Sequence, residues 1–199
     1  MRSLFNKQLI LSSLVFFISV SLSANEKDKS STQSAKTAAT QQSPQPSLHP
    51  KLELFRPFIN QTYRGEFASS TPDKPVIDVS KWERHLNGNA IRITHSLNEG
   101  SYGGETLIFY DKPNDKIRYF YFTTEGFFTE AEVTFDGSTM ISHEKVTGNQ
   151  NGITEVKAKA WLTPEGIMQT QSEYLQNGKW VPGHSATYKP APDAKVIFK

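Results

Sequence analysis

Three side chains are the strongest candidates for chemistry in this sequence: His95, Glu105 and Glu144. A carboxylate that orients an imidazole makes a general base, and a second carboxyl group beside the pair could stay protonated. One histidine and two carboxylates could also ligate a metal, but no spacing motif accompanies them, and no metal is predicted. The same groups could equally form a buried, hydrogen-bonded pair that only stabilises the core.

Two arginines, Arg84 and Arg118, offer a different chemistry. The guanidinium group presents a fork of donors that suits a carboxylate or a phosphate, so the pair could clamp the acidic head of a ligand. The alternative is that both lie at a rim, where they pair with loop acids such as Asp136 or reach solvent.

The familiar catalytic motifs are not found in the sequence. It contains no Gly-x-Ser-x-Gly, no His-Glu-x-x-His, no phosphate-binding glycine loop and no cysteine. No catalytic residue is therefore predicted beyond the weak candidates His95, Glu105 and Glu144.

Turn signals at even spacing indicate the elements that position these residues. The strongest are Asn87-Gly88, Asp136-Gly137 and Asn177-Gly178, and five more lie between residues 98 and 166. Each gap fits one strand and one tight turn, which with the segment 62–69 gives ten strands. The prediction is an all-β, ten-stranded antiparallel up-and-down β-barrel, because closure removes the sheet edges. A short N-terminal helix, with Leu52, Phe55, Phe58 and Ile59 inward, would plug one end.

The stretch IRYFYFTTEGFFTEAEVTF, residues 117–135, carries aromatic residues on both faces of a strand. Turn lengths predict the register of the hairpins, and the register decides which face lines the barrel. A two-residue turn at Asn87-Gly88 pairs Trp82 with Ile93, and a loop over residues 98–102 pairs His95 with Glu105. The predicted lumen residues are Trp82, Arg84, Ile93, His95, Glu105, Leu107, Phe109, Arg118, Phe120 and Phe122, with Thr129, Ala131, Val133, Met140, Ser142 and Glu144 continuing the inner face.

The opposite face of the same strands would be an exposed aromatic patch of Ile108, Tyr110, Tyr119 and Tyr121. Such a patch favours a homodimer or a protein partner, although tyrosine also tolerates solvent. After Gly148, Thr154, Val156, Ala158 and Ala160 are expected to point inward. For the last strand, either Trp180, Pro182 and His184 or Val181, Gly183 and Ser185 form the inner set.

The segment FINQTYRGEF after a short helix, followed by a β-meander of this length, resembles the calycin group of lipocalins and fatty-acid-binding proteins. The stretch GGETLIFYDKPNDKIRYFYFTTEGFFTEAEVTFDG is similar to uncharacterised bacterial lipocalin-like domains of the DUF1579 type. The lipocalin Gly-x-Trp signature is replaced here by Tyr63 and Arg64. The haem-binding nitrobindin barrels are a more distant comparison. The resemblance implies a ligand in the lumen and interior arginines that hold an acidic head.

The first residues have the pattern of a signal peptide: a basic start with Arg2 and Lys7, an apolar run, then small residues. The predicted organisation is a signal peptide at 1–24, a disordered Ser/Thr/Gln/Pro-rich linker at 25–49, the barrel at 50–189 and a C-terminal tail at 190–199. The chain has 22 Lys and Arg against 20 Asp and Glu, and both excess cations lie in the signal. The mature chain would be neutral, which gives no hint of nucleic-acid binding. It is expected to be secreted or periplasmic, with no membrane span after signal removal and no lipobox cysteine.

Three hypotheses for function follow. The leading one is an exported barrel that binds a small amphipathic or acidic ligand, fatty-acid-like or haem-like, without turnover. No cofactor is predicted, but in the haem version His95 or His184 would be the axial ligand. The second is a barrel isomerase or hydrolase that uses His95 with Glu105. The third is an interaction module with a packed lumen, which acts through the tyrosine patch.

Overall fold

The computed structural model describes residues 47–147 and 152–199. The predicted signal peptide and most of the predicted linker, together with the residues 148–151 of one predicted turn, lie outside the described residues. Within the described part of the chain, no helix is long and apolar enough to cross a membrane.

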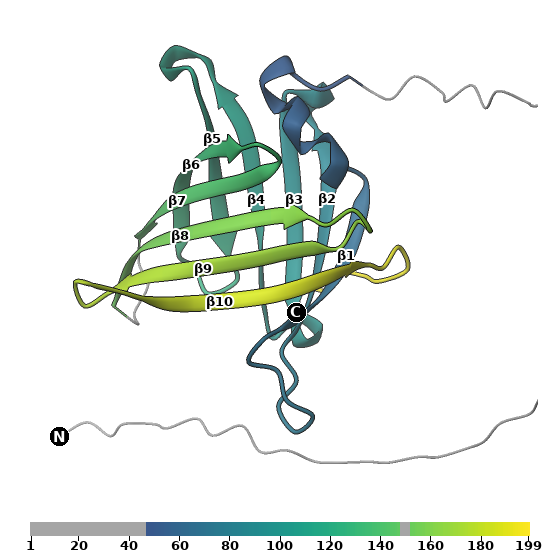
Figure 1. Cartoon of the computed structure of the whole chain (residues 1–199), viewed down its shortest axis with the longest axis vertical. Coiled ribbons are helices and arrows are strands. Elements are labelled where there is room, and N and C mark those ends of the chain that lie inside the picture. Colours follow the sequence, from purple (N-terminus) through teal and green to yellow (C-terminus); the bar gives the residue numbers. More distant parts are fainter. Residues whose placement is uncertain (1–46, 148–151) are drawn as a thin grey trace, which may run out of the picture. The chain divides into compact units, whose positions relative to one another are not determined.

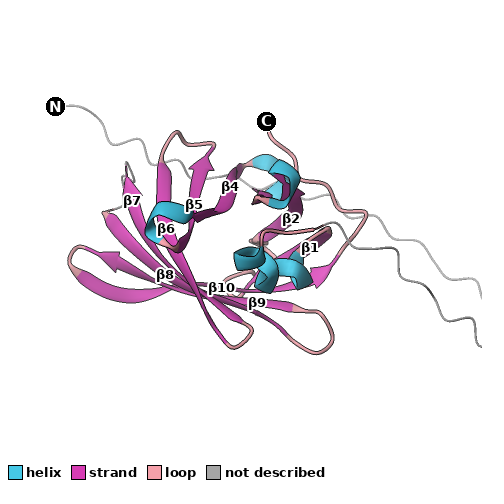
Figure 2. Ribbon diagram, turned by 90° about the horizontal axis from the view of Figure 1, so that it is seen from above, coloured by secondary structure: helices cyan, strands magenta, loops and turns pink. Residues whose placement is uncertain are grey.

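Ten antiparallel strands form one closed barrel, as the turn spacing predicted (Figure 1). The order around the barrel follows the sequence, and β1 pairs with β10 to close it. Figure 2 shows the same strands from above. The strands are β1 (Gln61–Phe67), β2 (Ile77–His85), β3 (Ala90–Leu97), β4 (Tyr102–Asp111), β5 (Lys116–Thr123), β6 (Phe128–Asp136), β7 (Thr139–Thr147), β8 (Ile153–Leu162), β9 (Met168–Gln176) and β10 (Lys179–Pro190).

A 3-10 helix, η1 (Pro50–Phe58), covers one end of the barrel, beside β2 and β3 (Figure 1). Leu52, Phe55 and Phe58 are fully buried, as predicted, while Ile59 is half-buried. Phe58 stacks on Trp82 with ring centroids 5.1 Å apart, and Phe55 meets Phe135 edge-on at 4.9 Å. These apolar contacts anchor the plug. Three one-turn 3-10 helices lie in the strand connections: η2 (Leu86–Gly88), η3 (Asn98–Gly100) and η4 (Lys112–Asn114).

The pairing of β2 with β3 has the predicted register, with Ser80 opposite His95 and Trp82 opposite Ile93. The pairing of β3 with β4 differs by one residue, because Leu97 faces Tyr102 across a four-residue connection instead of a five-residue one. His95 therefore lies opposite Gly104, not Glu105. A slip of one residue moves every side chain of the strand to the other face.

The slip reverses the predicted faces of β4 and β5. Thr106 and Ile108 of β4 face inward beside Tyr121 and Tyr119 of β5. A second one-residue difference, Phe122 opposite Phe128, then restores the predicted inner face of β6 and β7. Two small errors in turn length thus cancel, and only the two strands between them are reversed.

The predicted tyrosine patch is consequently wrong: Ile108, Tyr119 and Tyr121 lie inside the barrel. Tyr110 lies at the plugged end, where it stacks on His49 at 4.9 Å and its hydroxyl donates to Asp115. The outer face instead carries a row of neighbouring phenylalanines. Their ring centroids are 6.1 to 6.4 Å apart, and Phe122 is 50% exposed. The row consists of Phe109, Phe120, Phe122 and Phe128.

Bulges shape the last strands. Val156, Ala158 and Ala160 point inward as predicted, but a register shift between Ile153 and Glu155 turns Thr154 to solvent. In β10 a shift between Pro182 and Ser185 makes Val181 and His184 both inner residues. Neither predicted inner face is therefore correct along the whole strand. The inner residue before the bulge belongs to one predicted set and the inner residue after it belongs to the other. The C-terminal tail then packs outside β3, where Ile197 N–H donates to Ser96 Oγ over 3.0 Å.

Candidate ligand-binding site in the barrel lumen

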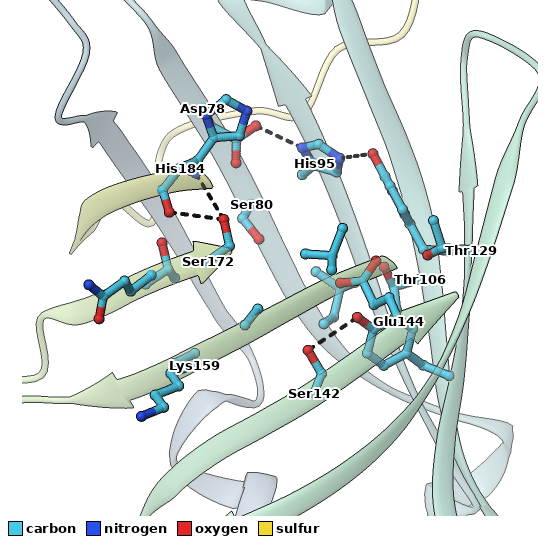
Figure 3. Close-up of a pocket in the computed structure, with 18 of the residues that line it drawn as sticks. Asp78, Ser80, His95, Thr106, Thr129, Ser142, Glu144, Lys159, Ser172 and His184 are labelled. Carbon is cyan, nitrogen blue, oxygen red and sulfur yellow. Dashed lines mark hydrogen bonds and ion pairs between the residues drawn. The ribbon is translucent and has the colours of Figure 1, made fainter. Parts of the chain in front are cut away.

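The barrel encloses a cavity of about 560 Å³ that is lined by residues of all ten strands. Apolar side chains make most of its wall, with Trp82, Ile108, Met140 and Met168 toward the plugged end. Polar groups gather on one side of the cavity and in its middle, as Figure 3 shows for Asp78, His95 and Glu144. A concave apolar wall with a few placed polar groups is typical of small-molecule sites.

A chain of hydrogen bonds crosses the lumen wall from β2 to β5. Asp78 Oδ1 accepts from His95 Nδ1 over 2.8 Å, and His95 Nε2 lies 2.8 Å from the Tyr121 hydroxyl (Figure 3). The Tyr121 and Tyr102 hydroxyls are 2.8 Å apart. Asp78 is only 2% exposed, and its second oxygen accepts from Tyr188. Both oxygens of this buried carboxylate are therefore satisfied.

This chain can hold its protons in two ways. If Tyr121 donates to His95 Nε2, the imidazole is neutral; if Nε2 carries a proton, Tyr121 accepts it and donates to Tyr102. In both arrangements Asp78 orients the ring through Nδ1–H. The second arrangement holds one proton more than the first, so the chain can exchange a proton with a group in the lumen through the Tyr121 hydroxyl group.

Glycines allow the tyrosine rings to cross neighbouring strands. Gly65 of β1 lies between Asp78 and Tyr188, and a Cβ atom there would overlap the Tyr188 ring. Gly104 of β4 lies between His95 and β5, and a Cβ atom there would overlap the Tyr121 ring. The Tyr188 ring thus lies over Gly65 and reaches Asp78 two strands away, and the Tyr121 ring lies over Gly104 and reaches His95 two strands away.

Glu144 is a second buried carboxyl group in the lumen, on β7. Burial raises its pKa above the ordinary value, and the nearby hydroxyl groups of Tyr119 and Thr129 oppose that shift. The side chain is half-buried: part of it is accessible from the cavity, and protein atoms surround the rest. Desolvation of this kind disfavours the charged form of a carboxyl group.

The lumen tyrosines also keep their protons. Burial raises the pKa of Tyr102, Tyr119, Tyr121 and Tyr174, and the Glu144 carboxylate adds to the shift in each case. Their hydroxyl groups therefore act as neutral donors and acceptors at ordinary pH.

The two histidines of the lumen differ in their freedom to bind a ligand. Both ring nitrogens of His95 take part in hydrogen bonds, so axial ligation of haem would break the chain. His184 lies between the rings of Phe67 and Tyr174, at 5.2 and 5.4 Å, and burial lowers its pKa. His184 fits an axial ligand better. The described residues contain no group of three or more His, Asp or Glu side chains that could hold a metal ion.

Of the residues predicted from sequence to bind a ligand, Trp82, Ile93 and His95 line the cavity. The reversed strands place Glu105, Leu107, Phe109, Phe120 and Phe122 on the outer face, where Glu105 pairs with Arg92 at 3.1 Å. Arg118 is also outside and binds Asp111 and Glu130. Arg84 faces the plugged end, where its Nε donates to the Ser47 carbonyl over 2.7 Å. The predicted acid clamp and the predicted His95–Glu105 pair are therefore wrong.

Sequence reasoning missed the tyrosines of the lumen. Tyr102, Tyr119, Tyr121, Tyr174 and Tyr188 supply five of the hydroxyl groups among the described residues that line it, beside those of three serines and three threonines. The paired glycines Gly103-Gly104 were a usable signal, because a glycine in a strand also marks a place that a neighbouring side chain crosses.

No protein-family model matches the chain, and no curated protein sequence matches it either. Among solved structures, the chain is similar to Rv2717c from M. tuberculosis, with a TM-score of 0.53. The sequences are 10% identical, and the match covers 73% of this chain and 99% of that one. A likeness at this identity supports the fold: the chain is a closed ten-stranded antiparallel β-barrel.

Proposed function

We propose that this protein binds a small amphipathic molecule in the barrel lumen, without turnover. The observation that carries the proposal is the cavity of about 560 Å³, whose mainly apolar wall holds a buried hydrogen-bonded chain. A barrel that served only as a scaffold would fill its interior with side chains. Here the apolar body of a ligand would lie against Ile93, Ile108 and Met140, with its polar group toward the tyrosines.

One unpaired donor in the wall supports this proposal. The Trp82 indole Nε1–H is buried and has no hydrogen-bond partner among the described residues. Buried donors in proteins are nearly always satisfied, and an unpaired one costs about 1–3 kcal/mol. A ligand acceptor, or a water that accompanies the ligand, would satisfy it.

The charges of the wall favour a ligand that is not an acid. Both arginines predicted to hold an acidic head lie elsewhere. Among the described residues that line the cavity the one lysine is Lys159, whose amino group points away from Glu144 (Figure 3). A buried carboxylate on a ligand would therefore meet Asp78 and Glu144 without a facing cation.

The test is to purify the full chain natively from the cells that make it and to compare its native and denatured masses. A small molecule that is lost on denaturation supports the proposal and identifies the ligand. An absorption spectrum of the same sample tests the haem version through a Soret band. A native mass equal to that of the polypeptide, together with failure to bind added 2-phenylethanol, would overturn the proposal.

An enzyme that uses proton transfer is the second candidate, because Asp78, His95 and Tyr121 form a relay that faces the cavity. The relay suits an isomerase or hydrolase in which a tyrosine hydroxyl protonates or deprotonates the substrate. His95→Gln separates the two functions. Binding of 2-phenylethanol survives this change under the first proposal, whereas turnover of any substrate is lost under the second.

Export is also a proposal, which the predicted signal peptide at 1–24 supports. N-terminal sequencing of the protein from its native source tests it. A mature chain that starts near residue 25 supports export, and a chain that starts at Met1 contradicts it.

A further inference from the structure

Glu144 lies in the same ladder row as two lumen tyrosines. From β5 to β9, the residues in register are Tyr119, Ala131, Glu144, Val156 and Tyr174. Glu144 is thus two strands from each tyrosine, about 10 Å of backbone distance, and the residues between are small enough for long side chains to meet above them. The two phenols flank the carboxyl group from opposite sides.

Two more tyrosines approach the same carboxyl group. Tyr102 and Tyr121, which are joined through their hydroxyl groups, line the same cavity as Glu144, and its charge contributes to raising the pKa of each. Four phenols, from β4, β5 and β9, therefore line the cavity together with this one carboxyl group. Thr129 of β6 lies beside it as well (Figure 3).

A carboxylate among aromatic rings is the arrangement that recognises an organic cation. The faces of tyrosine rings attract a positive charge, and a desolvated contact contributes about 2 kcal/mol. A carboxylate adds a charge-assisted hydrogen bond to a primary ammonium group. Neither feature favours an anion, and a neutral alcohol would gain only ordinary hydrogen bonds.

From this arrangement we infer that the lumen selects amphipathic amines, with Glu144 as the counter-ion of a ligand ammonium group held among Tyr102, Tyr119, Tyr121 and Tyr174. This inference rests on the proposed function and names its ligand class. The apolar body of the amine would extend toward Trp82 and Met168 at the plugged end.

Binding of an amine is expected to release protons, and this release can be measured. Burial raises the pKa of Glu144 above its ordinary value in the free protein, and the ammonium ion stabilises the carboxylate, so binding of the amine shifts this group toward ionisation and releases protons. The affinity for an amine then rises with pH until Glu144 is ionised in the free protein. The other titratable groups that line the cavity are Asp78, His95, Glu125, Lys159, His184 and Tyr188.

The experiment uses three probes that differ mainly in one group: 2-phenylethylamine, 2-phenylethanol and 3-phenylpropionate. Calorimetric titration of the full chain at pH 6 to 8, in two buffers of different ionisation enthalpy, gives affinities and proton release. We expect the amine to bind at least tenfold more tightly than the alcohol, the acid to bind most weakly, and the amine alone to release protons.

Glu144→Gln is the decisive variant, because the amide keeps the size and the neutral state of the protonated carboxyl group. It should remove the tenfold preference of the amine over the alcohol and the proton release. Lys157→Gln, on the outer face of β8, is the matched control and should behave like the wild type.

The outcomes separate the two proposals. If the alcohol binds as tightly as the amine, and the amine releases no proton, the lumen binds ligands but amine selection is wrong. If the wild type binds none of the three probes, both the amine inference and the proposed function are overturned.

Discussion

The hydroxyl group of Tyr188 donates to Asp78 Oδ2 over 3.1 Å, although 110 residues separate the two in sequence. Tyr188 is on the last strand and Asp78 on the second, so the bond spans the seam at which β1 closes the barrel. The Tyr188 ring lies over Gly65 of β1. Closure of the barrel and orientation of His95 therefore depend on the same carboxylate.

Gly65→Ala should destabilise the protein, because the new Cβ atom overlaps the Tyr188 ring. We expect the free energy of unfolding to fall by about 1–3 kcal/mol, the usual cost of overpacking. Urea unfolding of Gly65→Ala, Tyr188→Ala and the double variant measures the coupling. The alanine should cost much less when the ring has been removed, and strictly additive effects would disprove the proposed overlap.

The imidazole of His95 should carry a proton on Nδ1 whether the ring is neutral or charged, because Asp78 accepts from that atom. Nitrogen-15 NMR of the histidine ring tests this directly. Asp78→Asn should release the constraint and lower the free energy of unfolding by about 1–3 kcal/mol, since a charge-assisted bond is lost. A neutral wild-type ring protonated only on Nε2 would be incompatible with the hydrogen-bonded chain.

The raised pKa of Glu144 predicts a pH dependence of stability. The unfolded carboxyl group titrates near its ordinary pKa of 4.5, and the pKa of the folded one is higher. Between the two values the folded state holds the extra proton, so its stability falls as pH rises through this window and then levels off. Subtracting the unfolding free energies of Glu144→Gln from those of wild type, at pH 4 to 9, isolates the effect. A difference that stays constant with pH would show that burial does not shift this group.

The two faces of β5 should respond differently to truncation. Tyr119 is 8% exposed and faces the lumen, whereas Phe122 is 50% exposed on the outer face. Tyr119→Ala should cost about 3–5 kcal/mol of unfolding free energy, as for other buried aromatic residues. Phe122→Ala should cost about 1 kcal/mol or less. Urea unfolding compares them, and a larger loss for Phe122→Ala would mean that β5 has the opposite register.

The sequence was sufficient for the architecture because turns and strand alternation are local signals. Asn87-Gly88 and Asp136-Gly137 marked real hairpins, and the apolar spacing of Leu52, Phe55 and Phe58 identified the plug. The composition of the site was less predictable. The connection between Leu97 and Tyr102 has four residues, one fewer than the predicted loop over residues 98–102. This difference exchanged the inner and outer faces of β4 and β5 relative to the prediction.

The residue types of β5 did not indicate which of its faces points into the lumen. Phenylalanine and tyrosine are both common in strands, and β5 carries aromatic residues on both faces. The lumen is polar in its middle, which places Tyr119 and Tyr121 where a simple apolar core would have placed Phe120 and Phe122. The Asp78–His95 contact was within reach, because the correct register of β2 and β3 puts Ser80 opposite His95 and Asp78 one inward position away.

Blocking the lumen tests the central claim most directly. Ala158 lines the cavity on β8, and Lys157 beside it points to solvent. Calorimetric titration of 2-phenylethanol should show binding to the wild type and to Lys157→Phe, and at least a tenfold loss for Ala158→Phe, with circular dichroism to confirm that each variant is folded. Equal binding by a folded Ala158→Phe and the wild type would place the ligand outside the barrel and contradict the account.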